Sequence, residues 1–273
     1  MSFQGLRVIA FESRRAVEIA ELIRRKQGDA FVAPSMREAP LDDNHEAFAF
    51  AARLFAGAFD MMILLTGVGT RALNHALAAR YEEDQFAEAL RGLTVVARGP
   101  KPAAALREMR VPVTVLAPEP NTWREVLAST EGRPERKIAV QEYGKASPEL
   151  LDGLRKRGAE VTTVRIYRWD LPEDTAPLRE AAHRIARREA DVAFFTTSIQ
   201  IAHLLRIARE EGIETDVLKG LSEIVIASIG PSTSESLEEF GIQADLEPSH
   251  PKMGFLVQET ALGAAGILAR KRA

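Results

Sequence analysis

The stretch that decides the fold is V225-I-A-S-I-G-P-S-T-S-E-S-L-E-E-F-G241. Its apolar, β-branched run from Val225 to Ile229 predicts a strand, which ends at Gly230-Pro231. A helical pattern follows at once, and Ser232 and Glu235 have the spacing of a capping box at its N-terminus. Such a junction presents backbone N–H donors and the positive end of a helix dipole, so it favours an anionic ligand.

The same junction occurs earlier in the chain, in V95-V-A-R-G-P-K-P-A-A-A-L-R-E108. Three pairs of matching residues lie 131 positions apart: Gly99 and Gly230, Asp60 and Asp191, and Thr66 and Thr197. An offset of 130 positions relates Val8 to Ile138 and Gly28 to Gly158. The recurrence indicates a duplicated chain, and 273 residues suffice for two domains that each bury a core.

Strands and helices alternate along both halves. Strands are predicted at 6–11, 30–33, 61–65, 93–97, 113–116, 137–140, 160–166, 192–195, 223–228 and 244–246. Helices are predicted at 16–26, 46–58, 70–79, 101–109, 122–129, 148–157, 176–188, 199–211, 232–240 and after Pro251. This alternation predicts parallel sheets covered on both faces, so the fold class is α/β with two doubly wound domains.

Composition narrows the class of protein. The chain is 46% hydrophobic and 27% charged with a formal net charge of −3, which argues against a general nucleic-acid or membrane-surface binder. It has no cysteine, which excludes disulfides, thiolate catalysis and thiolate metal sites. The first ten residues lack a secretory signal pattern, and no apolar run has the length of a membrane span. We therefore expect a cytoplasmic protein.

Ligands of open α/β sheets bind beyond the carboxyl ends of the strands, so the turns that follow the predicted strands form the candidate site. Six of these turns are rich in small, hydroxyl-bearing and basic residues: Ser13-Arg14-Arg15, Thr66-Gly67, Arg98-Gly99 with Lys101, Tyr143-Gly144-Lys145, Thr197-Ser198, and Gly230 to Thr233. Helix capping alone explains any one of them. The six together predict an anion-binding site.

The segment Gly67-Val-Gly69-Thr-Arg-Ala72 matches the G-x-G-x-x-A pattern of a dinucleotide site. Such a site also requires an acidic residue about 20 positions further on, at the end of a second strand, but the next strand here ends at Arg98. The matching segment of the second half, 198–203, has no glycine, so we interpret the match as chance. The five histidines show no metal-ligand spacing, and neither a cofactor nor a metal is expected.

Tyr167 ends the predicted strand V161-T-T-V-R-I-Y167 and leads into a connector, 168–172. The repeat relates it to Arg37, in the proline-bounded connector 34–40. A phenol at this position can donate a proton to a ligand held between the domains. From position alone, an aromatic side chain that packs on a linker fits equally well.

Three signatures, in this order, resemble the uroporphyrinogen-III synthase family. They are V164-R-I-Y167 ahead of a domain crossing, F194-F-T-T-S198 before a helix, and I226-A-S-I-G-P-S-T-S-E-S-L-E-E-F-G-I242 followed by Glu247-Pro248. The resemblance covers essentially the whole chain. One departure is Gly67-Val-Gly69, which stands where the family has a serine-rich turn.

The resemblance implies two flavodoxin-like, doubly wound parallel-sheet domains joined by a two-stranded linker, with a cleft between them. Residues 1–35 and 172–273 would form the first domain, which is discontinuous in sequence, and 40–165 the second, inserted domain. Segments 34–40 and 165–172 would form the linker. A hinge of this kind allows closure on a large substrate.

The activity that the resemblance implies is that of a cyclising hydro-lyase. The linear tetrapyrrole hydroxymethylbilane loses its hydroxyl group, closes through a spiro intermediate with inversion of ring D, and gives uroporphyrinogen III without a cofactor. The resemblance assigns assistance in hydroxyl departure to Tyr167. Backbone N–H groups of the strand-end turns, with Arg14, Arg15, Arg98 and Lys101, would hold the acetate and propionate groups, and the hydroxyls of Ser198 and Thr233 would line the same cleft. The protein is expected to act as a monomer, without nucleic-acid or membrane partners.

Two other functions stay open. A two-lobe cytoplasmic binding protein or sensor for an anionic small molecule would share the hinge and the cleft but would lack a required proton donor. An NADP-dependent enzyme would place the glycine turn of 67–72 against phosphate and would read the 2′-phosphate with Arg98.

Overall fold

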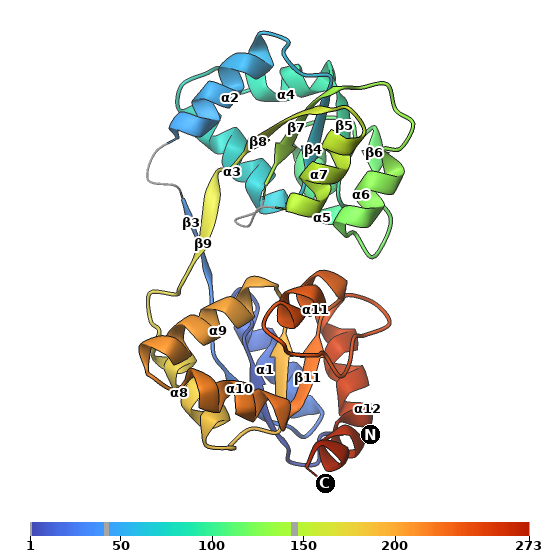
Figure 1. The fold of residues 1–273 in the computed structure, drawn as a ribbon. Coiled ribbons are helices and arrows are strands. Elements are labelled where there is room, and N and C mark those ends of the chain that lie inside the picture. The colour runs from blue at the N-terminus through green and yellow to red at the C-terminus, as the bar shows by residue number, and fades with distance from the viewer. Residues whose placement is uncertain (1, 41–43, 143–146, 273) are drawn as a thin grey trace. The chain divides into compact units, whose positions relative to one another are not determined.

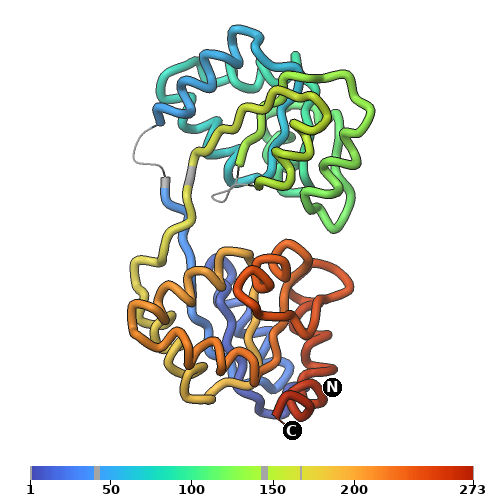
Figure 2. Tube along the Cα trace, in the orientation of Figure 1, coloured from blue at the N-terminus to red at the C-terminus, as the bar shows by residue number. Residues whose placement is uncertain are grey.

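The computed structural model describes residues 2–40, 44–142 and 147–272. The chain divides into two compact units (Figures 1 and 2). Unit 1 comprises Met1–Arg37 and Asp170–Ala273, and unit 2 comprises Glu38–Trp169. Unit 1 is therefore built from both ends of the chain, and unit 2 is inserted between them. Within the described ranges, no helix has both the length and the apolar character needed to cross a membrane.

Unit 1 contains a parallel sheet in the order β11-β10-β1-β2. Its strands are β1 (Arg7–Ala10), β2 (Asp29–Val32), β10 (Val192–Phe195) and β11 (Val225–Ser228). A single parallel bridge joins Ala227 to Leu246, within the short strand predicted at 244–246. The helices of the unit are α1 (Ala16–Arg25), α8 (Ala176–Ala186), α9 (Ile199–Glu210), α10 (Glu214–Ser222), α11 (Pro231–Glu238) and α12 (Met253–Lys271).

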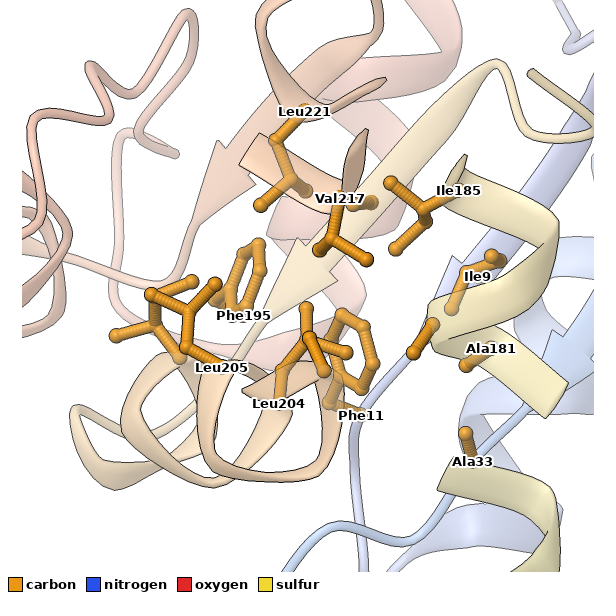
Figure 3. Close-up of a cluster of buried hydrophobic side chains, with 14 of the residues drawn as sticks. Ile9, Phe11, Ala33, Ala181, Ile185, Phe195, Leu204, Leu205, Val217 and Leu221 are labelled. Atoms are coloured by element: carbon orange, nitrogen blue, oxygen red, sulfur yellow. The ribbon is translucent and has the colours of Figure 1, made fainter. Parts of the chain in front are cut away.

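The side chains of this sheet alternate between two apolar layers, because successive residues of a strand point to opposite faces. Ile9 and Phe195 belong to a layer that includes residues of α8, α9 and α10, and Figure 3 shows this cluster in close-up. Val8 and Phe194 belong to the opposite layer, with residues of α1 and α12. The central strands are thus buried on both faces, as a parallel sheet requires.

In unit 2 the described residues form a five-stranded parallel sheet in the order β6-β5-β4-β7-β8. Met62 and Leu64 pack in one layer with α2, α3 and α4, and Met61 and Ile63 pack in the other with α6 and α7. The strands are β4 (Met61–Leu64), β5 (Thr94–Ala97), β6 (Val115–Leu116), β7 (Lys137–Gln141) and β8 (Glu160–Val164). The helices are α2 (His45–Phe55), α3 (Gly67–Ala78), α4 (Gln85–Arg91), α5 (Pro100–Glu108), α6 (Trp123–Ser129) and α7 (Pro148–Lys156).

The two sheets repeat one another in register. In unit 2, Met61 pairs with Ile138 and with Thr94, and Val96 pairs with Val115. In unit 1, the equivalent residues make the same pairs: Val192 with Val8 and with Val225, and Ala227 with Leu246. These pairs follow the sequence offsets of 131 and 130 positions. The duplication of the sequence is therefore a duplication of the fold.

The two predicted connectors contain short strands. β3 (Arg37–Pro40) pairs with β9 (Tyr167–Asp170) in a two-stranded sheet of its own. The Nε of Arg37 donates a hydrogen bond to the carbonyl of Leu171 at 3.1 Å, and its guanidinium lies 3.8 Å from the Asp170 carboxylate. These contacts fix the start of β3 beside the segment that follows β9.

The start of α11 differs from the sequence prediction. The N-cap residue is Gly230 and Pro231 is the first helical residue, without a side-chain cap, so the capping box predicted at Ser232 and Glu235 does not form. Proline at the first helical position needs no N–H partner and has a preset φ, so the helix begins one residue earlier than predicted. A capping box does form at Thr122 and Glu125, at the start of α6.

Three helical segments were not expected at their observed places. The short helices α4 and α10 are additional, and each follows the helix after a central strand. α3 begins at Gly67 and not at Thr70, because the Thr66 hydroxyl caps it by accepting a hydrogen bond from the N–H of Gly69. Side-chain capping therefore offsets the low helix propensity of two glycines.

An aspartate holds the amino ends of the two central strands together in each unit. In unit 1, the Asp191 carboxylate accepts hydrogen bonds from the N–H and the guanidinium of Arg7, each at 2.9 Å, and pairs with Arg272 at 3.0 Å. In unit 2, the equivalent Asp60 accepts a hydrogen bond from the N–H of Lys137 at 3.0 Å. Burial alone would raise the pKa of Asp191, but the hydrogen bonds from Arg7 outweigh it and lower that pKa to about 2.

We expect Asp191→Asn to lower the free energy of unfolding by about 2 kcal/mol at neutral pH, because it removes charge-assisted hydrogen bonds from a buried position. The carboxylate contributes its full stability above its unfolded pKa of about 4, and that contribution is lost as the pH falls through about 2. Urea unfolding of both proteins across this range measures the difference, which should shrink as the pH falls.

Glu21→Gln is the control for this experiment. It breaks an exposed pair with Arg25 at 3.7 Å and should change the free energy of unfolding by less than about 0.5 kcal/mol. A stability difference between the wild-type chain and Asp191→Asn that does not depend on pH would show that the carboxylate is not responsible.

Candidate functional site

The turns that follow the parallel strands lie at one edge of each sheet, where ligands of α/β sheets bind. We call these edges rim 1, in unit 1, and rim 2, in unit 2. Rim 1 consists of residues 11–15, 196–200 and 229–234, and rim 2 of residues 65–69, 98–101 and 141–142. The strand order reverses between β1 and β10 in unit 1 and between β4 and β7 in unit 2. Such a reversal opens a crevice between the neighbouring turns.

Glu12 organises the first turn of rim 1. Its Oε1 accepts hydrogen bonds from the backbone N–H groups of Arg14 (3.0 Å) and Arg15 (3.1 Å), and its Oε2 accepts one from the Thr196 hydroxyl at 2.6 Å. The guanidinium of Arg15 pairs with Glu18 in the first turn of α1. Two N–H groups that were expected to face an anion are therefore bonded to a carboxylate of the protein.

Ser13 holds the chain where it leaves β2. Its hydroxyl oxygen accepts hydrogen bonds from the N–H groups of Ser35 and Met36, both at 3.1 Å. The Ser35 hydroxyl donates to the carbonyl of Phe11 at 2.9 Å, and Nδ1 of His203 lies 2.7 Å from the Ser35 carbonyl. Burial lowers the pKa of His203, so the neutral ring donates from Nδ1. Ser13 thus anchors the segment that leads to β3.

Gln200 fixes the second turn of rim 1 and is only 1% exposed. Its Oε1 accepts hydrogen bonds from the N–H groups of Thr196 (2.6 Å) and Thr197 (3.2 Å). Its Nε2 donates to the Phe11 carbonyl at 2.8 Å and to the Thr196 hydroxyl at 3.0 Å. Gln200 therefore ties the carboxyl ends of β1 and β10 together, while Thr197 and Ser198 remain half-buried at the surface of the rim.

The third turn of rim 1 is the stretch after β11. Gly230 is buried, and its N–H lies 3.4 Å from the hydroxyl of the buried Ser228. Thr233 is 4% exposed, and the hydroxyl of Ser234 donates to the Glu247 carboxylate. Ser232 is half-buried. Of the hydroxyls predicted in this turn, that of Ser232 is accessible to a ligand, whereas that of Thr233 is enclosed.

The first turn of rim 2 is held by Gln141, which ends β7 and is fully buried. The N–H of Thr66 donates to Oε1 of Gln141 at 3.3 Å. A Cβ on Gly69 would lie 2.6 Å from Cδ of Gln141, and a Cβ on Gly67 would lie 2.5 Å from the carbonyl oxygen of Lys101. Both glycines are therefore required by close packing within unit 2.

Asn121 supports the second turn of rim 2. With its amide nitrogen turned toward them, it donates to the carbonyls of Arg98 at 3.0 Å and Ala117 at 3.2 Å. A Cβ on Gly99 would lie 2.9 Å from Cγ of Asn121, so the turn needs glycine there. Lys101 is exposed in the first turn of α5, where its charge adds to its own N–H, since the neighbouring Pro100 and Pro102 have none.

Glu142 follows β7 and is the repeat equivalent of Glu12. Its side chain is 5% exposed, and its Oε2 lies 3.7 Å from Nε of Arg165. Its Oε1 has no hydrogen-bond partner among the residues that the structure describes. Burial raises the pKa of Glu142, and the charge of Arg165 offsets this only in part. A buried carboxyl group of this kind at a ligand edge is typical of functional sites.

The structure places most of the site residues predicted from the sequence at the two rims. The turns at 13–15, 66–67, 98–101, 197–198 and 230–233 lie at the carboxyl edge of their own sheet, Tyr167 begins β9, and Gly144 lies outside the described residues. Sequence reasoning missed the side chains that hold these turns: Glu12, Asn121, Gln141, Glu142 and Gln200. These side chains could have been found from the sequence, because they are polar residues next to buried strands. A buried polar group without a hydrogen-bond partner lowers stability, so such residues are expected to make hydrogen bonds.

A cavity of about 390 Å³ lies elsewhere in unit 2. It is lined by residues at the starts of β4 and β7, by Leu154 of α7 and by the segments that precede β7 and β8, including Arg133, Arg136 and Arg157. It therefore lies at the amino edge of the sheet, opposite rim 2.

Comparison with known proteins identifies related chains. The sequence profile of the family described as uroporphyrinogen-III synthase HemD matches residues 17–258. The uncharacterised protein YjjA of Bacillus subtilis (strain 168) is 27% identical over 265 residues, which cover 94% of this chain and 95% of that protein. A protein of Methanothermobacter thermautotrophicus, provisionally named as a uroporphyrinogen-III synthase, is 29% identical over 233 residues, which cover 84% and 87%.

Solved structures of uroporphyrinogen III synthase from the extremely thermophilic bacterium Thermus thermophilus share the fold. A mutant form is 24% identical with a TM-score of 0.71, covering 94% of this chain and 99% of that chain. The wild-type protein is 23% identical with a TM-score of 0.55, covering 97% and 100%. The family profile extends over most of the sequence, and the chain belongs to the uroporphyrinogen-III synthase family.

Proposed function

We propose that this chain is a uroporphyrinogen-III synthase that cyclises hydroxymethylbilane to uroporphyrinogen III, with inversion of ring D and loss of water. The observation that carries the proposal is the match of the family profile to residues 17–258, which include all of rim 2 and the second and third turns of rim 1. The substrate carries acetate and propionate groups along a flexible chain. Two equivalent rims that both offer helix starts suit a ligand with many separate carboxylates.

Among the helices that begin at the two rims are α3 and α5 in unit 2, and α9 and α11 in unit 1. The first N–H groups of a helix have no partner within it, and the helix dipole favours negative charge beside them. The N–H groups of Thr66, Thr196 and Thr197 are already bonded to glutamines. We propose that the N–H groups at these starts that the protein does not already bond hold substrate carboxylates, with Lys101 adding a charge at the start of α5, between two prolines that have no N–H.

In the proposed reaction, the terminal hydroxyl group leaves as water after gaining a proton, and an azafulvenium-like cation remains. Ring D is attacked at its substituted carbon, and the spiro intermediate fragments and recloses with that ring inverted. We propose that the Tyr167 phenol assists the departure of the hydroxyl group. The rims contribute by holding the chain in the conformation that closes through ring D, because an unrestrained chain closes to the type I isomer.

The fine architecture that we propose is two flavodoxin-like domains joined by a linker. The order β2-β1-β10-β11 in unit 1 supports it, since it is the 2-1-3-4 order of a flavodoxin-like sheet with the bridge at Leu246 as the fifth position. The proposed domains are 1–35 with 172–273 and 40–165, and the pairing of β3 with β9 supports a linker at 34–40 and 165–172. We further propose that the protein acts as a monomer on this small-molecule substrate.

The glycine turn at 67–69 is better explained by packing than by a nucleotide. A nucleotide site uses such glycines for close approach of phosphate to the backbone. The space beside Gly67 and Gly69 is occupied by the Lys101 carbonyl and the Gln141 side chain. This packing disfavours the NADP-dependent alternative.

Incubation with freshly prepared hydroxymethylbilane tests the proposed function. We expect the wild-type chain to give mainly the type III isomer after oxidation and chromatographic separation, whereas buffer alone gives type I. Type I as the product in both samples would reject the synthase and leave a binding protein or sensor as the better account.

Tyr167→Phe should reduce the rate of type III formation about a hundredfold, the order of magnitude of a general-acid contribution. Its thermal midpoint should stay within about 2 °C of the wild type, because one hydroxyl group is removed. Tyr81→Phe is the matched control, since Tyr81 packs on Phe48 and Phe55 in unit 2, and it should keep full activity. Equal rates for both variants would remove Tyr167 from its role.

Lys101→Gln should raise KM for hydroxymethylbilane roughly fivefold and weaken the dependence of KM on salt, because it removes one cation from an anion-binding rim. Lys156→Gln removes a charge from the last turn of α7, at the amino edge of the same sheet, and should leave KM unchanged. The role of rim 2 in substrate binding would be refuted if both variants raised KM alike.

A further inference from the structure

Gln141 and Gln200 occupy the same kind of place in their units but come from different elements. Gln200 lies in the first turn of α9, whereas Gln141 is the last residue of β7. Under the repeat offsets, Gln200 is equivalent to Gly69 and Gln141 is equivalent to Phe11. Each unit thus has one glutamine where its central strands end, supplied by the helix in unit 1 and by the strand in unit 2.

The two glutamines make an equivalent hydrogen bond. Oε1 of Gln200 accepts from the N–H of Thr197 at 3.2 Å, and Oε1 of Gln141 accepts from the N–H of Thr66 at 3.3 Å. Thr66 and Thr197 are equivalent in the repeat; Thr66 directly precedes α3, and Thr197 lies two residues before α9. The equivalent threonine N–H is therefore bonded by a helix residue in unit 1 and by a strand residue in unit 2.

Only one of the two positions in a unit has room for a glutamine. In unit 2, a Cβ on Gly69 would lie 2.6 Å from Cδ of Gln141, far inside van der Waals contact. In unit 1, the position of Gln141 is taken by Phe11, whose ring packs on Phe195 with centroids 4.9 Å apart. The glycine at 69 is thus the complement of the glutamine at 141, and this pairing accounts for the departure from a serine-rich turn.

We propose that Gln141 and Gln200 are positioning residues that orient the two helix starts toward substrate carboxylates, and that Gly69 and Phe11 are their compensating partners. Each glutamine occupies the threonine N–H, so that the two N–H groups that follow it, at the starts of α3 and α9, are left for the ligand. The identity of the ligand rests on the proposed function. The second claim is that a glutamine on the strand in unit 2 replaces a glutamine on the helix in unit 1, which we call the exchange. It rests on the contacts within each unit alone.

A swap within unit 2 tests the proposal. Gln141→Phe removes the acceptor, Gly69→Gln creates an overlap, and the double variant reproduces the arrangement of unit 1. We expect each single variant to lower the thermal midpoint by about 5 °C or more and to raise KM for hydroxymethylbilane about tenfold, because a buried N–H loses its partner or the turn is displaced. The double variant should recover most of both losses.

Two further variants separate positioning from stability. Ile138→Ala, at the amino edge of β7, should lower the midpoint to a similar extent without changing KM. Gln200→Met keeps the size of the side chain but loses its hydrogen bonds, and should raise KM about tenfold in unit 1.

The results of these measurements test the exchange, the positioning role and the proposed function separately. A double variant whose midpoint equals the summed losses of the single variants would overturn the exchange, since the two positions would then be independent. Recovery of the midpoint without recovery of KM, or an unchanged KM for Gln200→Met, would overturn the positioning role. A wild-type chain that gives only type I product would instead reject the proposed function, and the thermal measurements would still decide the exchange.

Discussion

The pairing of two parallel strands that lie far apart in the sequence is the constraint on which each unit depends. In unit 1, β1 and β10 come from opposite ends of the chain, so the pairing must outweigh the entropy of closing a very long loop. An aspartate binds the two strands at their amino ends, through Asp191 or Asp60, and a glutamine binds them at their carboxyl ends, through Gln200 or Gln141. The aspartate holds the two strands in register, and the glutamine holds the turns of the rim.

We propose that acidic side chains decide which helix starts of the rims remain for a ligand. Glu12 satisfies N–H groups at the start of α1, and its equivalent Glu142 precedes α7 in the sequence. The start of α1 is thus already bonded to a carboxylate of the protein. The starts of α3, α5, α9 and α11 have no such carboxylate in the sequence before them. Under the proposed function, the same duplicated scaffold therefore leaves anions to the helices that follow the central strand and its outer neighbour.

Much of this architecture can be predicted from the sequence. Periodicity and the repeat predict the strands and most helices, because buried parallel strands read as short apolar runs between helical patterns. The repeat also predicts equivalent rims. The capping box at Ser232 fails because Pro231 starts the helix earlier, which is a local competition that spacing does not reveal. The roles of Gln141 and Gly69 could not be predicted, because their contact joins residues from two elements that meet only in the folded unit.

Hydrogen exchange with and without uroporphyrinogen III tests most directly whether the strand-end rims bind the tetrapyrrole. We expect slower exchange at the helix starts of both rims, in segments 66–70, 98–103, 197–201 and 230–234, because bound carboxylates take up the N–H groups that the protein leaves unbonded and restrict the opening of the others. The loops at the amino edges, including 130–136 beside the cavity of unit 2, should exchange at unchanged rates. Protection of those amino-edge loops with no change at the rims would contradict the account.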